Sequence, residues 1–175
     1  MNMKKLLLCV VVCGLGAASI AAEKKMLPPP AKSQMAGRGE LRTGIIGCDT
    51  SHTIEFAENP EFNVVSAYKW GSKDIFSSTN RYPVYIARLR ELGVTMVESI
   101  SELLAKCDVV LLETNDGRPH LEQAMEVFKS GKPVFIDKPL VNTEEDLRTF
   151  VRWREAGAKF ISSSSLRYCK EIEPY

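Results

Sequence analysis

An acid and a lysine follow an apolar run in the second half of the chain. The run Pro133-Val134-Phe135-Ile136 is typical of a buried strand, and Asp137-Lys138-Pro139 comes directly after it. Open α/β sheets bind their ligands at the carboxyl ends of their strands, so Asp137 and Lys138 would lie at a ligand-binding edge. Lys138 is therefore a candidate for chemistry. The simpler alternative is a solvated turn that ends at Pro139.

A second segment with chemical potential runs from Gly44 to His52, between the first expected strand and the first expected helix. A dinucleotide fingerprint there requires three spaced glycines, of which Gly47 supplies the first, while Asp49 and His52 stand at the other two positions. An ionised Asp49 would repel a pyrophosphate and obstruct the approach of the backbone. We expect weak cofactor binding that Asp49→Gly tightens. Alternatively, Asp49 caps the helix or contacts His52, and the same change costs about 1 kcal/mol.

The neighbouring polar residues leave the choice of cofactor open. Thr50 and Ser51 could cap the first helix, which is the simpler role, or donate hydrogen bonds to a phosphate. The second strand ends at Lys69 without the carboxylate that usually binds a ribose diol. Lys69 or Ser72 near a 2′-phosphate would be compatible with NADP, although a solvated side chain is the simpler explanation of each residue.

Apolar runs that alternate with amphipathic stretches predict the elements that position these residues. The expected strands are 42–47, 63–69, 94–97, 108–113, 133–136 and 159–162, and the expected helices are 51–58, 83–92, 100–106, 119–130 and 143–156. Ser99 and Glu102 form a capping box, and Gly131 and Gly157 stand just beyond two helices. The pattern predicts a doubly wound α/β domain with a parallel sheet, and a long loop over residues 70–82. We expect its strand ends to bring together Gly47, Asp49, Thr114, Asn115 and Lys138.

The ends of the chain differ in composition from this domain. Residues 1–22 combine a short basic start, an apolar core and small residues, which is typical of a secretory signal peptide, and residues 23–40 form a proline-containing linker. The expected domain is 41–168, in an exported protein that is periplasmic or secreted, without a stable membrane span after cleavage. The formal net charge of +1 gives no electrostatic footprint for nucleic acid. Cys48 and Cys107 are expected to be small buried residues.

Several short motifs together resemble the N-terminal half of the Gfo/Idh/MocA oxidoreductase family. They are Gly44-Ile45-Ile46-Gly47, Thr114-Asn115, Pro119-His120, Gly131-Lys132-Pro133-Val134 and Asp137-Lys138-Pro139. The family usually has Glu-Lys-Pro at the last of these, so Asp137 is one methylene shorter and keeps the charge. The resemblance extends from Leu41 to Tyr168, and the spacing from His120 to Lys138 is its most specific part.

The resemblance implies a Rossmann-like domain of an NAD- or NADP-dependent oxidoreductase that acts on sugars or polyols. It places Lys138 near the nicotinamide, where a lysine can hydrogen-bond the substrate oxygen and stabilise charge as hydride moves. The remaining implied cofactor-binding positions are Gly47, Asp49, Thr50, Ser51, Thr114, Asn115, His120 and Asp137. A helix-start histidine that only caps or packs is an equal alternative for His120.

The resemblance also implies a second, substrate-binding domain, of which residues 169–175 would be the start. We therefore expect a truncated protein that is inactive alone and that could form homo-oligomers through the missing domain. A non-catalytic exported binding domain that has lost its cofactor is the alternative function. A metal-assisted lyase or hydrolase using Asp49, His52 and Glu113 is a third reading, but no pair has a metal-ligand spacing, so no metal site is predicted.

Overall fold

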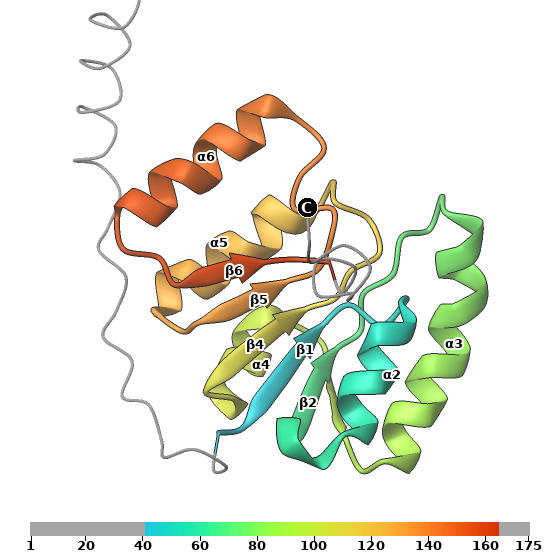
Figure 1. Cartoon of the computed structure of the whole chain (residues 1–175). Coiled ribbons are helices and arrows are strands. Elements are labelled where there is room, and N and C mark those ends of the chain that lie inside the picture. The colour runs from blue at the N-terminus through green and yellow to red at the C-terminus, as the bar shows by residue number, and fades with distance from the viewer. Residues whose placement is uncertain (1–40, 165–175) are drawn as a thin grey trace, which may run out of the picture.

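The computed structural model describes residues 41–164 as one parallel six-stranded sheet flanked by helices (Figure 1). The strand order is β3-β2-β1-β4-β5-β6, which is the doubly wound arrangement of nucleotide-binding domains. The strands are β1 (Thr43–Ile46), β2 (Val64–Tyr68), β3 (Thr95–Val97), β4 (Val109–Leu112), β5 (Val134–Ile136) and β6 (Phe160–Ser162). The expected fold class is confirmed, and every expected strand is present with ends within one residue.

Helices connect successive strands. They are α2 (Ser51–Glu58), α3 (Phe76–Glu91), α4 (Ile100–Lys106), α5 (His120–Ser130) and α6 (Glu144–Glu155), with a short 3₁₀ helix, η1 (Pro60–Phe62), before β2. Four of the five expected helices are correct to within one residue at each end. The fifth, α3, begins at Phe76, so the expected loop over residues 70–82 is wrong in its second half. Pro83 lies inside α3, and the burial of Ser78, Ile86 and Leu89 on one face outweighs the hydrogen bond that the proline removes.

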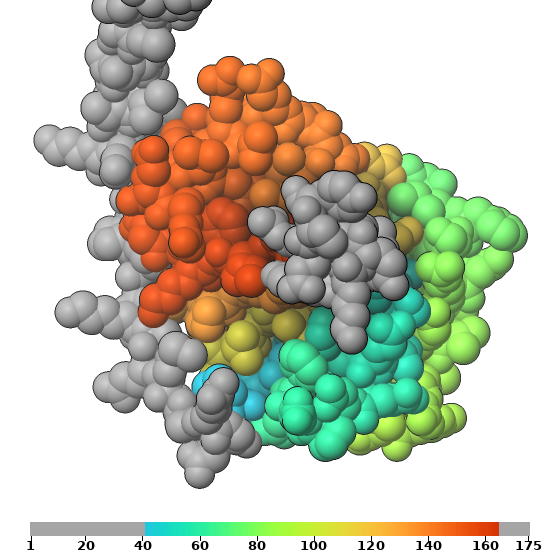
Figure 2. Space-filling view, viewed as in Figure 1, coloured from blue at the N-terminus to red at the C-terminus, as the bar shows by residue number. Residues whose placement is uncertain are grey.

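Two apolar layers hold the helices against the two faces of the sheet. Side chains alternate along each strand, so Ile45 and Leu111 pack with the residues of α3, whereas Ile46 and Leu112 pack with those of α4, α5 and α6. Figure 1 shows α2 and α3 together on one side of the sheet. In the space-filling view of Figure 2 the first and second halves of the domain occupy opposite sides of the visible face.

Helix-end signals in the sequence operate as expected. The Ser99 hydroxyl accepts a hydrogen bond from the backbone N–H of Glu102 at 3.1 Å, which caps α4. Gly131 and Gly157 follow α5 and α6 with φ values of +75° and +98°, a conformation that glycine adopts without steric cost. These residues fix where α4 begins and where the chain leaves α5 and α6 for the next strands.

The two described cysteines are buried and free, as expected. Burial raises the pKa of the Cys48 thiol to about 12 and that of Cys107 to about 11, so both remain protonated and serve as packing residues. The expected signal peptide and linker, and residues 165–175, lie outside the described residues. Within 41–164, no helix combines the length and apolar character needed to cross a membrane.

Candidate functional site

The loops after β1, β4 and β5 meet at the carboxyl edge of the sheet. The backbone N–H of Glu113 donates to the Ile46 carbonyl, and that of Asp137 donates to the Leu112 carbonyl, so the three strands end level with one another. Gly47 leaves β1 with φ +93°, and a Cβ there would lie 2.5 Å from the Thr114 nitrogen. Glycine is therefore required at the first fingerprint position, because the β1 and β4 loops approach too closely for any side chain.

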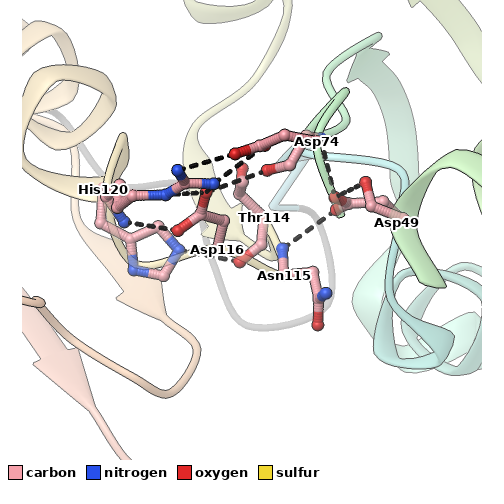
Figure 3. Close-up of polar contacts among 9 residues, drawn as sticks. Asp49, Asp74, Thr114, Asn115, Asp116 and His120 are labelled. Carbon is pink, nitrogen blue, oxygen red and sulfur yellow. Dashed lines mark hydrogen bonds and ion pairs between the residues drawn. The ribbon is translucent and has the colours of Figure 1, made fainter. Parts of the chain in front are cut away.

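The Asp49 carboxylate makes neither of the two protein contacts considered from the sequence, a cap on the first helix or a contact with His52. Its buried carboxylate accepts hydrogen bonds from the Asn115 N–H at 3.0 Å, the Ser72 N–H at 3.3 Å and the Ser78 hydroxyl at 2.5 Å (Figure 3). It does not cap α2, and His52 contacts Asp137 instead. Asp49 thus ties the β1 loop to the loops after β2 and β4, and donors of the protein engage both of its oxygens.

Thr50 and Ser51 flank the start of α2. Thr50 is the N-cap residue, but its hydroxyl donates to the Glu113 carbonyl at 3.2 Å, so the expectation that its side chain caps the helix is wrong. Ser51 is the exposed first residue of the helix. Among residues 41–164 no side chain caps α2, so within this part of the chain its first backbone N–H groups are available to an anion.

A charged network links the loops after β2 and β4. Arg118 pairs with Asp74 at 2.8 Å and with Asp116 at 2.6 Å, and the Ser72 hydroxyl donates to Asp116 at 3.2 Å. Burial acts to raise the pKa of Asp116, but the hydrogen bonds from Arg118 outweigh burial and lower it. Separate hydrogen bonds from the Arg118 guanidinium lower the pKa of Asp74. Both acids are therefore ionised at neutral pH, and the network fixes the β4 loop (Figure 3).

A cavity of about 890 Å³ opens beside this network. Its walls come from the end of β2, the start of α3 and the β4 loop, and they include the aromatic residues Tyr68, Trp70 and Tyr82 and the cations Lys69, Lys73 and Arg118. The volume is within the range of small-molecule and cofactor pockets. The sequence indicated Lys69 and Ser72 but not Asp74, Asp116 or Arg118. The Asp116-Gly117-Arg118 turn after the fourth strand was the available signal.

Lys138 stands at the other end of the same edge. Its ammonium nitrogen lies 3.8 Å from Asp137 Oδ2, and the lysine side chain is 53% exposed. The Lys138 backbone N–H donates to Asp137 Oδ1 at 2.8 Å. The peptide bond between Lys138 and Pro139 is cis. Asp137 Oδ2 also contacts His52 Nδ1 at 2.8 Å. Asp137 is therefore positioned by α2 and by its own turn, and it holds Lys138 at the carboxyl end of β5.

Thr114 and His120 are built into the framework of the site. The Thr114 hydroxyl donates to Gln123 Oε1 at 2.9 Å, and His120 Nε2 is 2.8 Å from the Thr114 carbonyl oxygen. Both side chains have no exposed surface. The structure therefore gives them a part in shaping the β4 loop and no direct path to a bound cofactor. Asn115, by contrast, is partly exposed, and its backbone N–H is bound to Asp49.

Solved structures of similar fold include dehydrogenases of which this chain covers only part. They include UDP-N-acetylglucosamine 3-dehydrogenase GnnA from Acidithiobacillus ferrooxidans (18% identity, TM-score 0.57, covering 77% of this chain and 41% of that one). The WlbA dehydrogenase from Bordetella pertussis, solved in complex with NADH and UDP-GlcNAcA, is 22% identical with a TM-score of 0.58, and the match covers 77% of this chain and 40% of that one. The MviM dehydrogenase from Clostridium difficile is 20% identical with a TM-score of 0.58, and the match covers 77% of this chain and 44% of that one. This chain thus spans about two fifths of their length.

Comparison with protein families is more specific than these structural likenesses, which establish the fold alone. No curated protein matches the chain significantly. The model of the GFO_IDH_MocA oxidoreductase family, described by its NAD-binding Rossmann fold, matches residues 8–162, which is most of the chain. The protein therefore belongs to the GFO_IDH_MocA family and carries its NAD-binding Rossmann fold.

Proposed function

We propose that this chain is the nucleotide-binding part of an NAD- or NADP-dependent oxidoreductase that acts on a sugar or polyol. The observation that carries the proposal is the placement of Lys138 at the same sheet edge as the Gly47 loop and the uncapped start of α2. The names of the GnnA and WlbA structures include the sugar nucleotides UDP-N-acetylglucosamine and UDP-GlcNAcA, which supports a sugar as the class of substrate. The fold would bind the cofactor across the carboxyl edge of the sheet.

The residues at this edge fit a dinucleotide. The cavity beside Trp70 has room and an aromatic wall for an adenosine half, and Gly47 keeps the β1 turn free of side-chain bulk. The uncapped N–H groups of α2 suit a pyrophosphate. Asp49 stands where a second glycine is usual, but the protein already engages its carboxylate. Repulsion of a phosphate by Asp49 is therefore smaller than the sequence suggested.

Lys138 would perform the part of the chemistry that belongs to this chain. A bound nicotinamide supplies a hydride acceptor or donor. Lys138, which is half exposed, donates a hydrogen bond to the substrate oxygen and stabilises the negative charge that develops there. Asp137 positions the lysine, because its Oδ2 lies 3.8 Å from the Lys138 ammonium nitrogen. His52 in turn fixes the Asp137 carboxylate.

Trp70 provides a direct test of cofactor binding, because it lines the cavity and is 36% exposed, whereas Trp153 is buried. We expect NADH or NADPH to quench the tryptophan fluorescence of the full chain saturably. Trp70→Phe should remove the quenching while calorimetry still detects binding. Lys138→Ala should bind the cofactor with little change. Absence of saturable binding by both methods would favour the non-catalytic domain instead.

The proposal includes export of the protein. Residues 1–22 carry the sequence features of a signal peptide, as set out above. Expression of the full chain in a bacterium should give a mature protein in the periplasmic fraction that begins at about residue 22 or 23. N-terminal sequencing of that fraction tests the expectation. Recovery of an uncleaved chain in the cytoplasm would contradict it.

A further inference from the structure

Three side chains from separate elements meet beside Lys138. His52 is the second residue of α2, Glu113 directly follows β4, and Asp137 directly follows β5. Their ligand atoms, one from each residue, all lie within 4.8 Å of one another. The proposed function uses Asp137 and His52 only to position Lys138, and it gives Glu113 no role.

The spacing of these atoms is close to that of ligands around one metal ion. His52 Nδ1 lies 2.8 Å from Asp137 Oδ2 and 3.9 Å from Glu113 Oε2. Two ligands of a tetrahedral zinc ion, each at its usual bond length, are about 3.3 Å apart. The observed distances bracket this value, so small side-chain rotations would place all three atoms on one ion.

Glu113 is the independent observation that points to a ligand. Its side chain has no exposed surface, and neither carboxylate oxygen has a hydrogen-bond partner among the described residues. Burial, and then the charge of Asp137, raise its pKa well above the usual range. An unpartnered buried carboxyl group is costly, and proteins keep such groups where something binds them.

Neighbouring cations do not fill this role. The charge of Lys138 acts on Glu113, but its ammonium group contacts Asp137 at 3.8 Å, its side chain is half exposed, and it forms no ion pair with Glu113 in the described structure. His52 is 28% exposed, so solvent reaches the cluster at the imidazole. A small cation can therefore enter from that side and reach the buried carboxylate.

We propose that His52 Nδ1, Glu113 and Asp137 bind a divalent first-row transition-metal ion. One imidazole nitrogen and two carboxylates form a donor set that suits Zn²⁺, and three protein ligands are the number found in zinc sites that keep a further position for water or substrate. The ion would lie beside Lys138. The inference goes beyond the proposed oxidoreductase function and does not depend on it, because it concerns binding of the metal alone.

Calorimetric titration with Zn²⁺ tests the proposal on the full chain after removal of metals with a chelator, without cofactor or substrate. We expect one ion per chain. Glu113→Gln keeps the shape of the side chain and should weaken binding by at least about tenfold, and His52→Ala should do the same. Glu126→Gln removes an exposed carboxylate of α5 and should bind as the wild type does.

A second measurement separates this site from other groups that bind metals. Co²⁺ bound through His52 should give visible absorption bands that disappear in His52→Ala, a variant at a partly exposed position that circular dichroism should show to be folded. Equal Zn²⁺ affinity in the wild type, Glu113→Gln and His52→Ala would overturn the proposal. Cofactor binding measured through Trp70 is a separate result, so the two proposals can fail independently.

Discussion

At the scale of single residues, Asp49 shows how a position can keep its place in a fold while its chemistry changes. A glycine there lets the backbone approach a phosphate, whereas Asp49 uses its carboxylate to bind three donors of the protein. Those donors belong to the loops after β2 and β4 and to the first turn of α3. The residue therefore helps to assemble the edge of the sheet on which a cofactor would lie.

Replacement of Asp49 by asparagine should destabilise the domain by about 2 to 3 kcal/mol, because hydrogen bonds to a buried charged group are strong and the new amide would present a donor to other donors. Urea denaturation of the full chain measures the loss. Ser78→Ala removes one of the three hydrogen bonds and should cost less, about 1 kcal/mol. Equal stability of Asp49→Asn and the wild type would show that these contacts contribute nothing.

Asp49→Gly should not give the tighter cofactor binding that the repulsion argument from the sequence expects. It removes the same three hydrogen bonds and gives the β1 loop more freedom, so we expect lower stability and no tighter binding of NAD(H) or NADP(H). Calorimetric titration of the glycine variant beside the wild type decides the point. Tighter binding by the variant would restore the repulsion argument.

At the scale of elements, α4 offers a clear test of local stability. Ser99→Ala removes the hydroxyl that accepts from the Glu102 N–H and should destabilise the domain by about 1 kcal/mol. Ser101→Ala, two residues later on the exposed face of α4, makes the same chemical change without removing a cap. Urea denaturation should show a loss only for Ser99→Ala. A similar loss in both variants would mean that the cap has no special effect.

The elements that could be predicted from the sequence are those with local signals. The Ser99 cap, the glycines after α5 and α6 and the apolar strands each depend on a few adjacent residues, and all are confirmed. The start of α3 could not be predicted in this way, because Pro83 is a local breaking signal that burial of Ile86 and Leu89 overrides.

The contacts within the site could not be predicted for a related reason. Parallel strands imply which residues reach one edge, and Lys138 and Gly47 are both found there. The order of the strands does not determine which side chains contact one another at that edge. His52, Glu113 and Asp137 are far apart in sequence and meet only because β1, β4 and β5 are neighbours, so no ligand spacing marks them.

At the scale of the whole molecule, an ion pair joins the two central strands at the edge opposite the site. Arg42 lies just before β1, and Asp108 lies just before β4. The Asp108 carboxylate accepts hydrogen bonds from the Arg42 backbone N–H at 3.0 Å and from the Arg42 guanidinium at 3.0 and 2.8 Å. The Asp108 N–H donates back to the Arg42 carbonyl at 2.7 Å. This double contact holds β1 and β4 in register where the two halves of the sheet meet.

The Arg42–Asp108 pair should make stability depend on pH in the acid range. Hydrogen bonds from the Arg42 side chain, and then from its backbone, lower the pKa of Asp108 from 3.8 to about 2. The folded state therefore holds the ionised form more tightly than the unfolded chain does, and this contribution to stability is complete above the unfolded value of 3.8. It is lost as the pH falls through about 2, and below that pH Asp108 is protonated in both states. Thermal unfolding of the wild type and Asp108→Asn should differ most near neutral pH, and the difference should shrink as the pH falls from 3.8 through about 2. Glu126→Gln should show no such trend. A difference that stays constant down to pH 2 would assign the effect to packing rather than to charge.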